Sequence, residues 1–292
     1  MGTFRSFGPE SAMGDSSGAS IPAKSGGLLY VVATPIGNLA DFSQRGREAL
    51  AGSDLILCED TRHTRKLLDH YDIRRPTESY HDFSEAEKAP RLVERLVAGA
   101  TMALVSDAGT PTVSDPGYRL VRLARQAGLR VVPIPGPVAA MAALSVSGLP
   151  TDEFLFVGFL PPRQEARRRR LEGLAGQRAT LILYEAPQRV RQTLTDILET
   201  LGDREAFVGR EITKLHEECR LGPVSSLVDQ VTARGEVVIV VAGADPSPEK
   251  LAGVDLEGMS RQDIVKLAAR SLGVRRNELY ARLFRKDGSD SE

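Results

Sequence analysis

The stretch LLYVVATPIGNL, residues 28–39, decides the fold class. Its first six residues form an uninterrupted apolar run, which is typical of a strand buried on both faces of a parallel sheet. A Thr-Pro-Ile-Gly turn follows at once, in which Pro restricts φ and Gly permits positive φ. The chain therefore leaves the predicted strand in a tight turn with exposed backbone, which suits a ligand site and a plain strand–helix connection equally. The stretch contains neither the GxGxxG of dinucleotide sites nor the Gly-Lys-Ser/Thr of a phosphate-binding loop.

Short apolar runs of the same kind recur along the chain and alternate with segments of helical period. This alternation predicts an α/β fold of crossover units, with a mostly parallel sheet. The predicted strands are 28–33, 55–58, 102–105, 131–134, 154–159, 181–184, 206–208 and 237–242. The predicted helices include 86–98, 118–127, 188–201 and 224–233.

Breaks in these patterns divide the chain into two α/β domains. Gly148 and Pro150 end a helix and mark the boundary between them. The N-terminal segment is rich in Ser, Gly and Ala and lacks the apolar core of a signal peptide, so we expect a disordered tail. The expected divisions are a tail (1–26), an N-terminal α/β domain (27–148), a C-terminal α/β domain (151–244), a linker (245–258) and a basic helical hairpin (259–287).

Ser260 and Asp263 have the spacing of a capping box and predict the start of the hairpin's first helix, 261–272. A second helix is expected from about residue 275 to 286. Basic side chains far outnumber acidic ones in this segment, so it is a candidate surface for a polyanion.

The composition excludes several classes of protein. The 292 residues carry a formal net charge of -1, so no global field attracts nucleic acid. Two distant cysteines, Cys58 and Cys219, favour neither a disulfide framework nor a zinc ribbon, and they fit a reducing, cytoplasmic location. No apolar run approaches the roughly 18 residues of a membrane span, so no membrane partner is expected.

A second turn with polar side chains follows the predicted strand 55–58. Glu59 and Asp60 are adjacent carboxylates, which are costly at a strand end unless they are paired or functional. The alternative is structural: Asp60 or Thr61 caps a helix over 62–71, with Arg62 paired to an acid.

Two further turns are rich in small residues and Pro. The sequence VSDAGTP, 105–111, is followed by SDPGY, 114–118, and PIPGP, 133–137, leads into a helix of small residues. Asp115 is a candidate cap for the helix after Pro116, whereas no predicted helix begins at Asp107. All four turns end predicted strands, which is where open α/β sheets bind ligands.

Together the four turns resemble the signature blocks of the tetrapyrrole methylase superfamily and, within it, of the methyltransferases of small-subunit ribosomal RNA. The resemblance covers residues 28–243 and extends more loosely through the basic C-terminal segment. The blocks are YVVATPIGNL (30–39), EDTR (59–62), ALVSDAGTP (103–111), DPGY (115–118) and VPIPGP (132–137).

The resemblance implies two α/β domains with S-adenosylmethionine in the cleft between them, and a homodimer. It also implies 2′-O-methylation of a cytidine in the decoding region of 16S ribosomal RNA, in the small ribosomal subunit. The superfamily's usual Gly-Asp-Pro is here Gly109-Thr110-Pro111, with the acid earlier, at Asp107. By position, the implied cofactor contacts are Pro35, Asp107, Ala108, Gly109, Thr110, Val113, Val138, Ala139, and Leu183 or Tyr184.

A sulfonium methyl group is already activated, so the chemistry requires no metal, and the sequence shows no metal-spaced His/Cys cluster. The protein must place the acceptor oxygen in line and supply a base or a cation near it. We expect Glu59 or Asp60 at the reacting end of the cleft. Lys214 is a further candidate, although Lys214 and Glu217 are equally explained as a surface ion pair. His81 suits a contact with a base, or is a plain polar surface residue.

The predicted RNA contacts are basic clusters, since the chain as a whole is neutral. Four consecutive arginines point around a helix, so a solvated helix is the alternative. The candidates are Arg167, Arg168, Arg169, Arg170, Arg275 and Arg276. Two rival functions remain at this point: a methylase of a tetrapyrrole or other small substrate, and a non-catalytic RNA-binding assembly factor.

Overall fold

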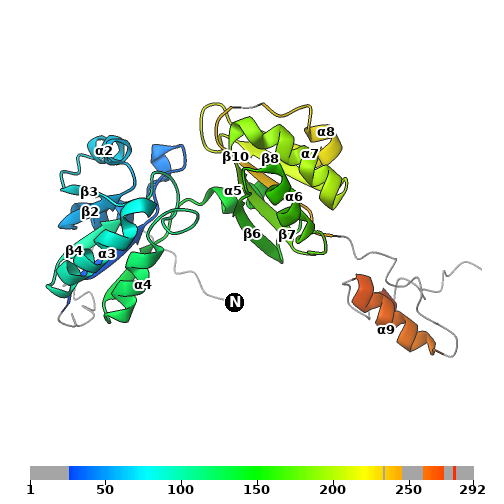
Figure 1. The fold of residues 1–292 in the computed structure, drawn as a ribbon, viewed down its shortest axis with the longest axis horizontal. Helices are drawn as coiled ribbons and strands as arrows, with labels where there is room; N and C mark the ends of the chain where they lie inside the picture. Colours follow the sequence, from blue (N-terminus) through cyan, green and yellow to red (C-terminus); the bar gives the residue numbers. More distant parts are fainter. Residues whose placement is uncertain (1–25, 233, 245–258, 273–278, 281–292) are drawn as a thin grey trace, which may run out of the picture.

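The computed structural model describes residues 26–232, 234–244, 259–272 and 279–280 (Figure 1). Two α/β lobes lie side by side, and each is built on a five-stranded sheet. The predicted α/β class is therefore confirmed.

The N-terminal sheet has the strand order β3-β2-β4-β1-β5, and all of its pairs are parallel. The carboxyl ends of its strands therefore meet at one edge. The strands are β1 Leu28–Val32, β2 Leu55–Cys58, β3 Thr77–Ser79, β4 Thr101–Leu104 and β5 Arg130–Ile134.

Helices cover both faces of this sheet, which explains the unbroken apolar runs of its strands. Ile56 of β2 packs in the cluster formed with α1 and α2, and its neighbour Leu57 packs in the cluster formed with α3 and α4. Successive residues of a strand point to opposite faces, so one apolar run serves both cores. The helices are α1 Gln44–Ala51, α2 Thr61–His70, α3 Asp82–Val97 and α4 Tyr118–Gln126, with a 3-10 turn at Leu39–Asp41.

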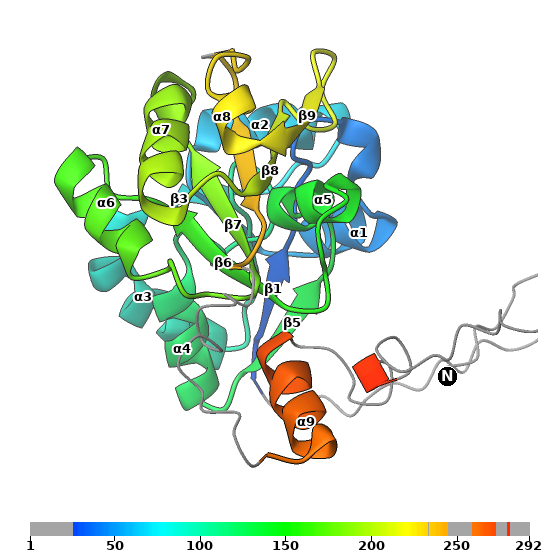
Figure 2. The same cartoon turned by 90° about the vertical axis from the view of Figure 1, so that its right-hand side faces the viewer.

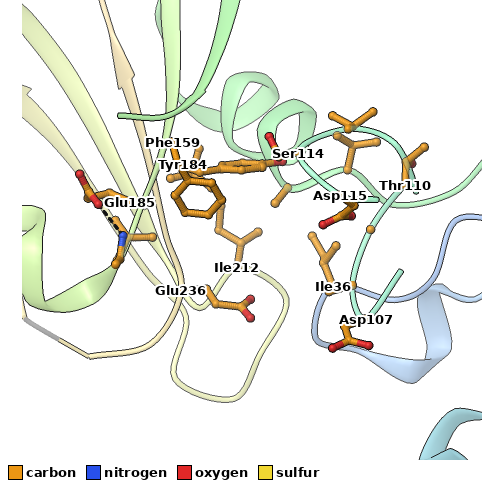
Figure 3. A pocket seen from close by; sticks show the side chains of 18 of the residues that line it. Ile36, Asp107, Thr110, Ser114, Asp115, Phe159, Tyr184, Glu185, Ile212 and Glu236 are labelled. Atoms are coloured by element: carbon orange, nitrogen blue, oxygen red, sulfur yellow. Dashed lines mark hydrogen bonds between the residues drawn. The ribbon is translucent and has the colours of Figure 1, made fainter. Parts of the chain in front are cut away.

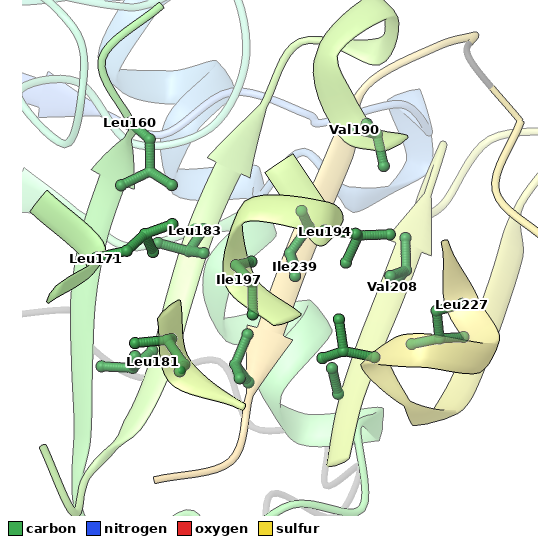
Figure 4. Close-up of a cluster of buried hydrophobic side chains, with 14 of the residues drawn as sticks. Leu160, Leu171, Leu181, Leu183, Val190, Leu194, Ile197, Val208, Leu227 and Ile239 are labelled. Atoms are coloured by element: carbon green, nitrogen blue, oxygen red, sulfur yellow. The ribbon is translucent and has the colours of Figure 1, made fainter. Parts of the chain in front are cut away.

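The second sheet is mixed, with the order β6-β7-β10-β8-β9. Only β6 and β7 pair in parallel, and the other pairs are antiparallel. Helices α6, α7 and α8 cover one face (Figure 4), and α5 covers the other (Figure 2). The strands are β6 Phe154–Phe159, β7 Thr180–Glu185, β8 Glu205–Arg210, β9 Glu218–Pro223 and β10 Val237–Val241. The helices are α5 Ala139–Val146, α6 Gln164–Glu172, α7 Val190–Leu201 and α8 Val224–Leu227, with a 3-10 turn at Pro187–Arg189.

Helix α5 packs on the second sheet, not the first. Ala140 and Ala143 share a buried cluster with Ile182 of β7 and Val240 of β10. We expected the N-terminal domain to extend to residue 148, but these contacts put the change of lobe before α5, in the 135–137 turn. The small side chains of α5 let the helix lie close to the strands.

The structure contains elements that the apolar runs did not predict. Strand β3 has three residues, and β9 is an edge strand whose residues alternate between half-buried and exposed. Neither therefore carries a continuous apolar run. Helix α8 is also shorter than the predicted helix over 224–233, since it spans only Val224–Leu227.

The predicted start of the C-terminal hairpin is confirmed by α9, Arg261–Leu272. The Asp263 amide donates a hydrogen bond to Ser260 Oγ at 3.2 Å, which makes Ser260 the N-cap of this helix. The tail through residue 25, the linker at 245–258 and almost all of the second hairpin helix lie outside the described residues. None of the helices in the described ranges is both long and apolar enough to cross a bilayer.

Candidate functional site

The four predicted turns meet at the carboxyl edge of the N-terminal sheet. The first and third form an antiparallel bridge: the Thr34 amide donates to the Gly109 carbonyl at 2.8 Å, and the Gly109 amide donates to the Thr34 carbonyl at 3.1 Å. The Asp60 amide of the second turn donates to Asp107 Oδ1 of the third at 3.1 Å. Residues far apart in the sequence thus form one backbone platform.

The fourth turn joins this platform to the second lobe. The Thr110 hydroxyl donates to the Pro137 carbonyl at 3.3 Å. Next to this turn, the Ala140 amide at the start of α5 donates to the Tyr184 hydroxyl of β7 at 3.1 Å. The Phe159 ring lies against the Tyr184 ring, with 5.6 Å between centroids. An aromatic wall from the second lobe therefore faces the turns of the first.

A cavity of about 430 Å³ lies between the lobes (Figure 3). This volume falls in the range of small-molecule and cofactor sites. The N-terminal turns and the start of α5 contribute Ile36, Glu59, residues 107–110, residues 113–115, Val138 and Ala139. The second lobe contributes Phe159, residues 184–187, Ile212 and residues 236–238.

Backbone strain is concentrated on both sides of this cavity. Thr112 and Ser114 have φ values of 74° and 64°, and Glu211 and Thr213 across the cavity have 51° and 70°. Left-handed backbone costs residues other than glycine about 1–2 kcal/mol each. The bulge at Gly158 brings β6 close to the third turn, since a Cβ there would lie 3.1 Å from Ser114 Oγ. Strain of this kind clusters at functional sites.

Three carboxylates from separate turns face the cavity and influence one another. Burial raises the pKa of Glu59, and the charges of Asp107 and Asp82 raise it further, while His81, the N-cap of α3, partly offsets them. Burial also raises the pKa of Asp115 to about 6, with contributions from Glu59 and Asp107. Such a group attracts a cation and contains acids poised to hold a proton. Within the described ranges, no three His, Cys, Asp or Glu side chains are arranged to hold a metal ion.

Glu59 and Asp60 have different surroundings, because α2 begins directly after Asp60. Asp60 is the N-cap of this helix, and its Oδ1 accepts the Arg62 amide at 2.8 Å. Hydrogen bonds from the Arg62 side chain and amide lower the pKa of Asp60 to about 2. Asp60 is not among the cavity-lining residues, whereas Glu59 is. Asp115 does not cap a helix, because α4 begins after Gly117.

Lys214 is held in an ion-pair network at the edge of the cavity. Its Nζ lies 2.9 Å from Glu211 Oε1 and 3.0 Å from Glu236 Oε2, and Glu236 lines the cavity. Burial lowers the pKa of Lys214, but hydrogen bonds to the two glutamates outweigh this effect and raise it. This direction favours the charged form of Lys214, which suits the cationic role and not that of a base. Glu217 instead accepts the Thr213 amide at 2.6 Å.

All but two of the predicted cofactor residues line the cavity. Pro35 lines a second, adjacent cavity. The next residue in the chain, Ile36, lines the cavity between the lobes instead. Leu183 points into the core of the second lobe, whereas Tyr184 faces the cavity, as the alternation of a strand requires.

Besides Asp115, which was expected only as a candidate helix cap, two cavity-lining acids were not predicted. Glu185 accepts the Thr193 hydroxyl at 2.6 Å and pairs with Arg189 at 2.6 Å. Glu236 pairs with Lys214. Glu185 directly follows the apolar strand run at 181–184, and Glu236 directly precedes the run at 237–241. An acid next to a buried strand was the feature of the sequence that could have marked these two residues as part of the site.

The arginine run does not form one surface. Arg167 is fully buried, with Nε 2.7 Å from Asp196 Oδ2, and Arg168 shares this partner. The prediction that Arg167 contacts RNA is therefore wrong, because the phase of α6 turns it toward α7. Arg169 and Arg170 are exposed. Arg275 and Arg276 lie outside the described residues.

Residues 28–228 match the family model of the Tetrapyrrole (Corrin/Porphyrin) Methylases. The chain belongs to the tetrapyrrole methylase family. The matched residues include all four turns of the platform and every strand of the two sheets except β10.

This tetrapyrrole methylase is 47% identical over 267 residues to Ribosomal RNA small subunit methyltransferase I of Mesorhizobium japonicum, covering 88% of this chain and 91% of the relative. The protein of that name from Xylella fastidiosa is also 47% identical over 267 residues, covering 87% and 98%. The resemblance inferred from the signature blocks is confirmed. The structure of uroporphyrin-III C-methyltransferase from Thermus thermophilus complexed with S-adenosylhomocysteine shares the fold, with a TM-score of 0.52, 19% identity, and 74% and 97% coverage.

Proposed function

We propose that this chain is an S-adenosylmethionine-dependent methyltransferase that methylates the ribose 2′-oxygen of a cytidine in 16S ribosomal RNA. One observation carries the proposal: the cavity between the lobes joins most of the predicted cofactor residues to the half-buried carboxylate of Glu59. The name of the curated relatives supports small-subunit ribosomal RNA as the substrate.

The residues around the cavity suit the cofactor. The small residues Ala108, Gly109 and Ala139 line one side, and the Tyr184 ring offers a flat apolar surface. The carboxylates favour a cationic ligand over a neutral one. When bound, S-adenosylmethionine supplies an activated methyl group on a positively charged sulfur.

Glu59 is the proposed base. A ribose hydroxyl is a weak nucleophile at neutral pH, and a carboxylate whose pKa is raised accepts its proton more readily. The surrounding turns hold the reactants in line, which lowers the entropic part of the barrier. Lys214 is a positioning residue in this proposal, because it fixes Glu236 at the cavity wall.

The proposed RNA contacts are the exposed arginines of α6 and the basic C-terminal segment. A homodimer and a cytoplasmic location, where small subunits are made, complete the proposal.

The test uses small ribosomal subunits that lack the modification, incubated with methyl-labelled S-adenosylmethionine. We expect label on the 2′-oxygen of one cytidine, located by nuclease mapping and mass spectrometry. Label on a base, or no label despite cofactor binding in calorimetry, contradicts the proposal.

Glu59→Gln is expected to lower the single-turnover rate by about 10²–10⁴, the usual contribution of a general base. Asp60→Asn is the comparison, because Asn still caps α2 and should leave the rate within a few fold. Equal rates for wild type and Glu59→Gln, at saturating cofactor, would remove Glu59 from the mechanism.

A further inference from the structure

A second cavity of about 220 Å³ lies beside the first, at the same edge of the N-terminal sheet. The first turn, the start of α2 and the third turn enclose it. Its lining residues are Thr34, Pro35, Leu39, His63, Thr64, Lys66, Leu67, Ser106 and Asp107. At about half the volume of the cofactor cavity, it suits a smaller ligand.

The two cavities share one wall residue, Asp107. Its carboxylate is oriented by the Asp60 amide, which donates to Oδ1 at 3.1 Å. Asp107 also lies close enough to Glu59 to raise the pKa of that carboxyl. A group held in the second cavity at Asp107 is therefore adjacent both to the cofactor cavity and to the proposed base.

The second cavity opens beside a basic stretch of surface. In the stretch 62–75, Arg62 is paired with Asp60, and Arg74 with Asp72. The exposed cations Arg65, Lys66 and Arg75 of the same segment have no such pair among the described ion pairs. Lys66 and His63 line the cavity themselves. This local excess of positive charge contrasts with the chain's net charge of -1. It suits a phosphate backbone passing over α2.

We infer that the second cavity seats the acceptor nucleotide of the RNA, while α2 binds the flanking phosphates. This inference rests on the proposed function and adds the substrate site to it. With S-adenosylmethionine bound in the first cavity, a ribose held at Asp107 would present its 2′-oxygen to the cofactor from the second cavity, and Glu59 would accept the hydroxyl proton. The cofactor would supply the methyl group, and its sulfur would keep the electron pair of the broken carbon–sulfur bond.

Leu39→Trp and Lys66→Ala test this site separately. Leu39 is 39% exposed, so a larger side chain extends into the cavity without disturbing the core. Leu39→Trp is expected to raise KM for small ribosomal subunits about tenfold while leaving the S-adenosylmethionine Kd within twofold. Lys66→Ala is expected to weaken subunit binding and to reduce its salt-dependence slope by about one.

Arg122→Ala is the matched control, because it removes an exposed cation from α4, on the opposite face of the same sheet. It should leave KM and the salt slope unchanged. If wild type labels subunits but Leu39→Trp keeps its KM and Lys66→Ala behaves like Arg122→Ala, the acceptor site is wrong and the proposed function stands. If wild type labels no subunits, the proposed function itself fails.

Discussion

At the scale of single residues, the surroundings of two carboxyl groups near the cavity shift their pKa values in opposite directions. Asp60 has hydrogen-bond donors from Arg62, which stabilise its charge and lower its pKa. Asp115 is half-buried and faces other acids, so its charge is disfavoured and its pKa rises to about 6. Asp115 therefore carries a cost in stability, which is typical of a functional site.

We expect Asp115→Asn to stabilise the ligand-free protein, and to do so more at pH 8 than at pH 5. Because the folded-state pKa exceeds the unfolded value of 3.8, the folded protein binds the proton more tightly. The contribution of Asp115 to stability is present below pH 3.8 and is lost as pH rises through about 6. Urea denaturation should show a gain about 1 kcal/mol larger at pH 8. A gain that does not vary with pH contradicts this account.

At the scale of elements, α6 shows how helical phase divides one run of identical residues. Arg167 and Asp196 are both fully buried where α6 packs on α7, and Gln164 also donates to Asp196 at 3.0 Å. Arg169 lies on the opposite side of the helix, 77% exposed, and pairs with Glu165 four residues earlier. The same side chain is therefore structural at one position and available for a ligand at another.

Arg167→Ala should lower the free energy of unfolding by about 3–5 kcal/mol, because it leaves the Asp196 charge buried with one partner fewer. Arg169→Ala should change it by less than about 1 kcal/mol, as expected for an exposed pair. Chemical denaturation of both variants measures the difference. Similar losses for the two would mean that Asp196 is compensated by another group.

At the scale of the whole molecule, the cofactor cavity exists because the two lobes meet. Gly37 of the first turn lies directly against the 211–217 turn of the second lobe. A Cβ at Gly37 would lie 2.4 Å from Lys214 Cγ and 2.8 Å from Thr213 Oγ1. Thr213 is one of the strained residues, and Ile212 lines the cavity. We therefore expect the close contact at Gly37 to control the spacing of the two lobes beside the cavity.

Gly37→Ala is expected to force the lobes apart and to weaken S-adenosylhomocysteine binding about tenfold, a typical cost of overpacking. The melting temperature should change little, because neither core is touched. Gly176→Ala is the control, since a Cβ there meets nothing within 4 Å. If calorimetry gives the same Kd for Gly37→Ala and wild type, the contact does not control the cavity.

Much of this arrangement was predictable from contiguous sequence. The strand runs and the four turns are local signals, and strands that share a direction bring their carboxyl ends to one edge. The helix start at Ser260 was likewise a local signal and is confirmed by the hydrogen bond from the Asp263 amide to Ser260 Oγ. Short or edge strands such as β3 and β9 were missed, because their pairing, not their composition, makes them strands.

The sequence by itself determined the α/β class, the family and the residues from which a cofactor site is built, because each is written in short, continuous segments. Only the tertiary structure decided that Glu59 faces the cavity while Asp60 caps a helix, and that Arg167 is buried. It also decided that α5 belongs with the second sheet and that Asp107 separates two cavities. These outcomes depend on helical phase and on contacts between residues far apart in the chain, and no local pattern contains that information.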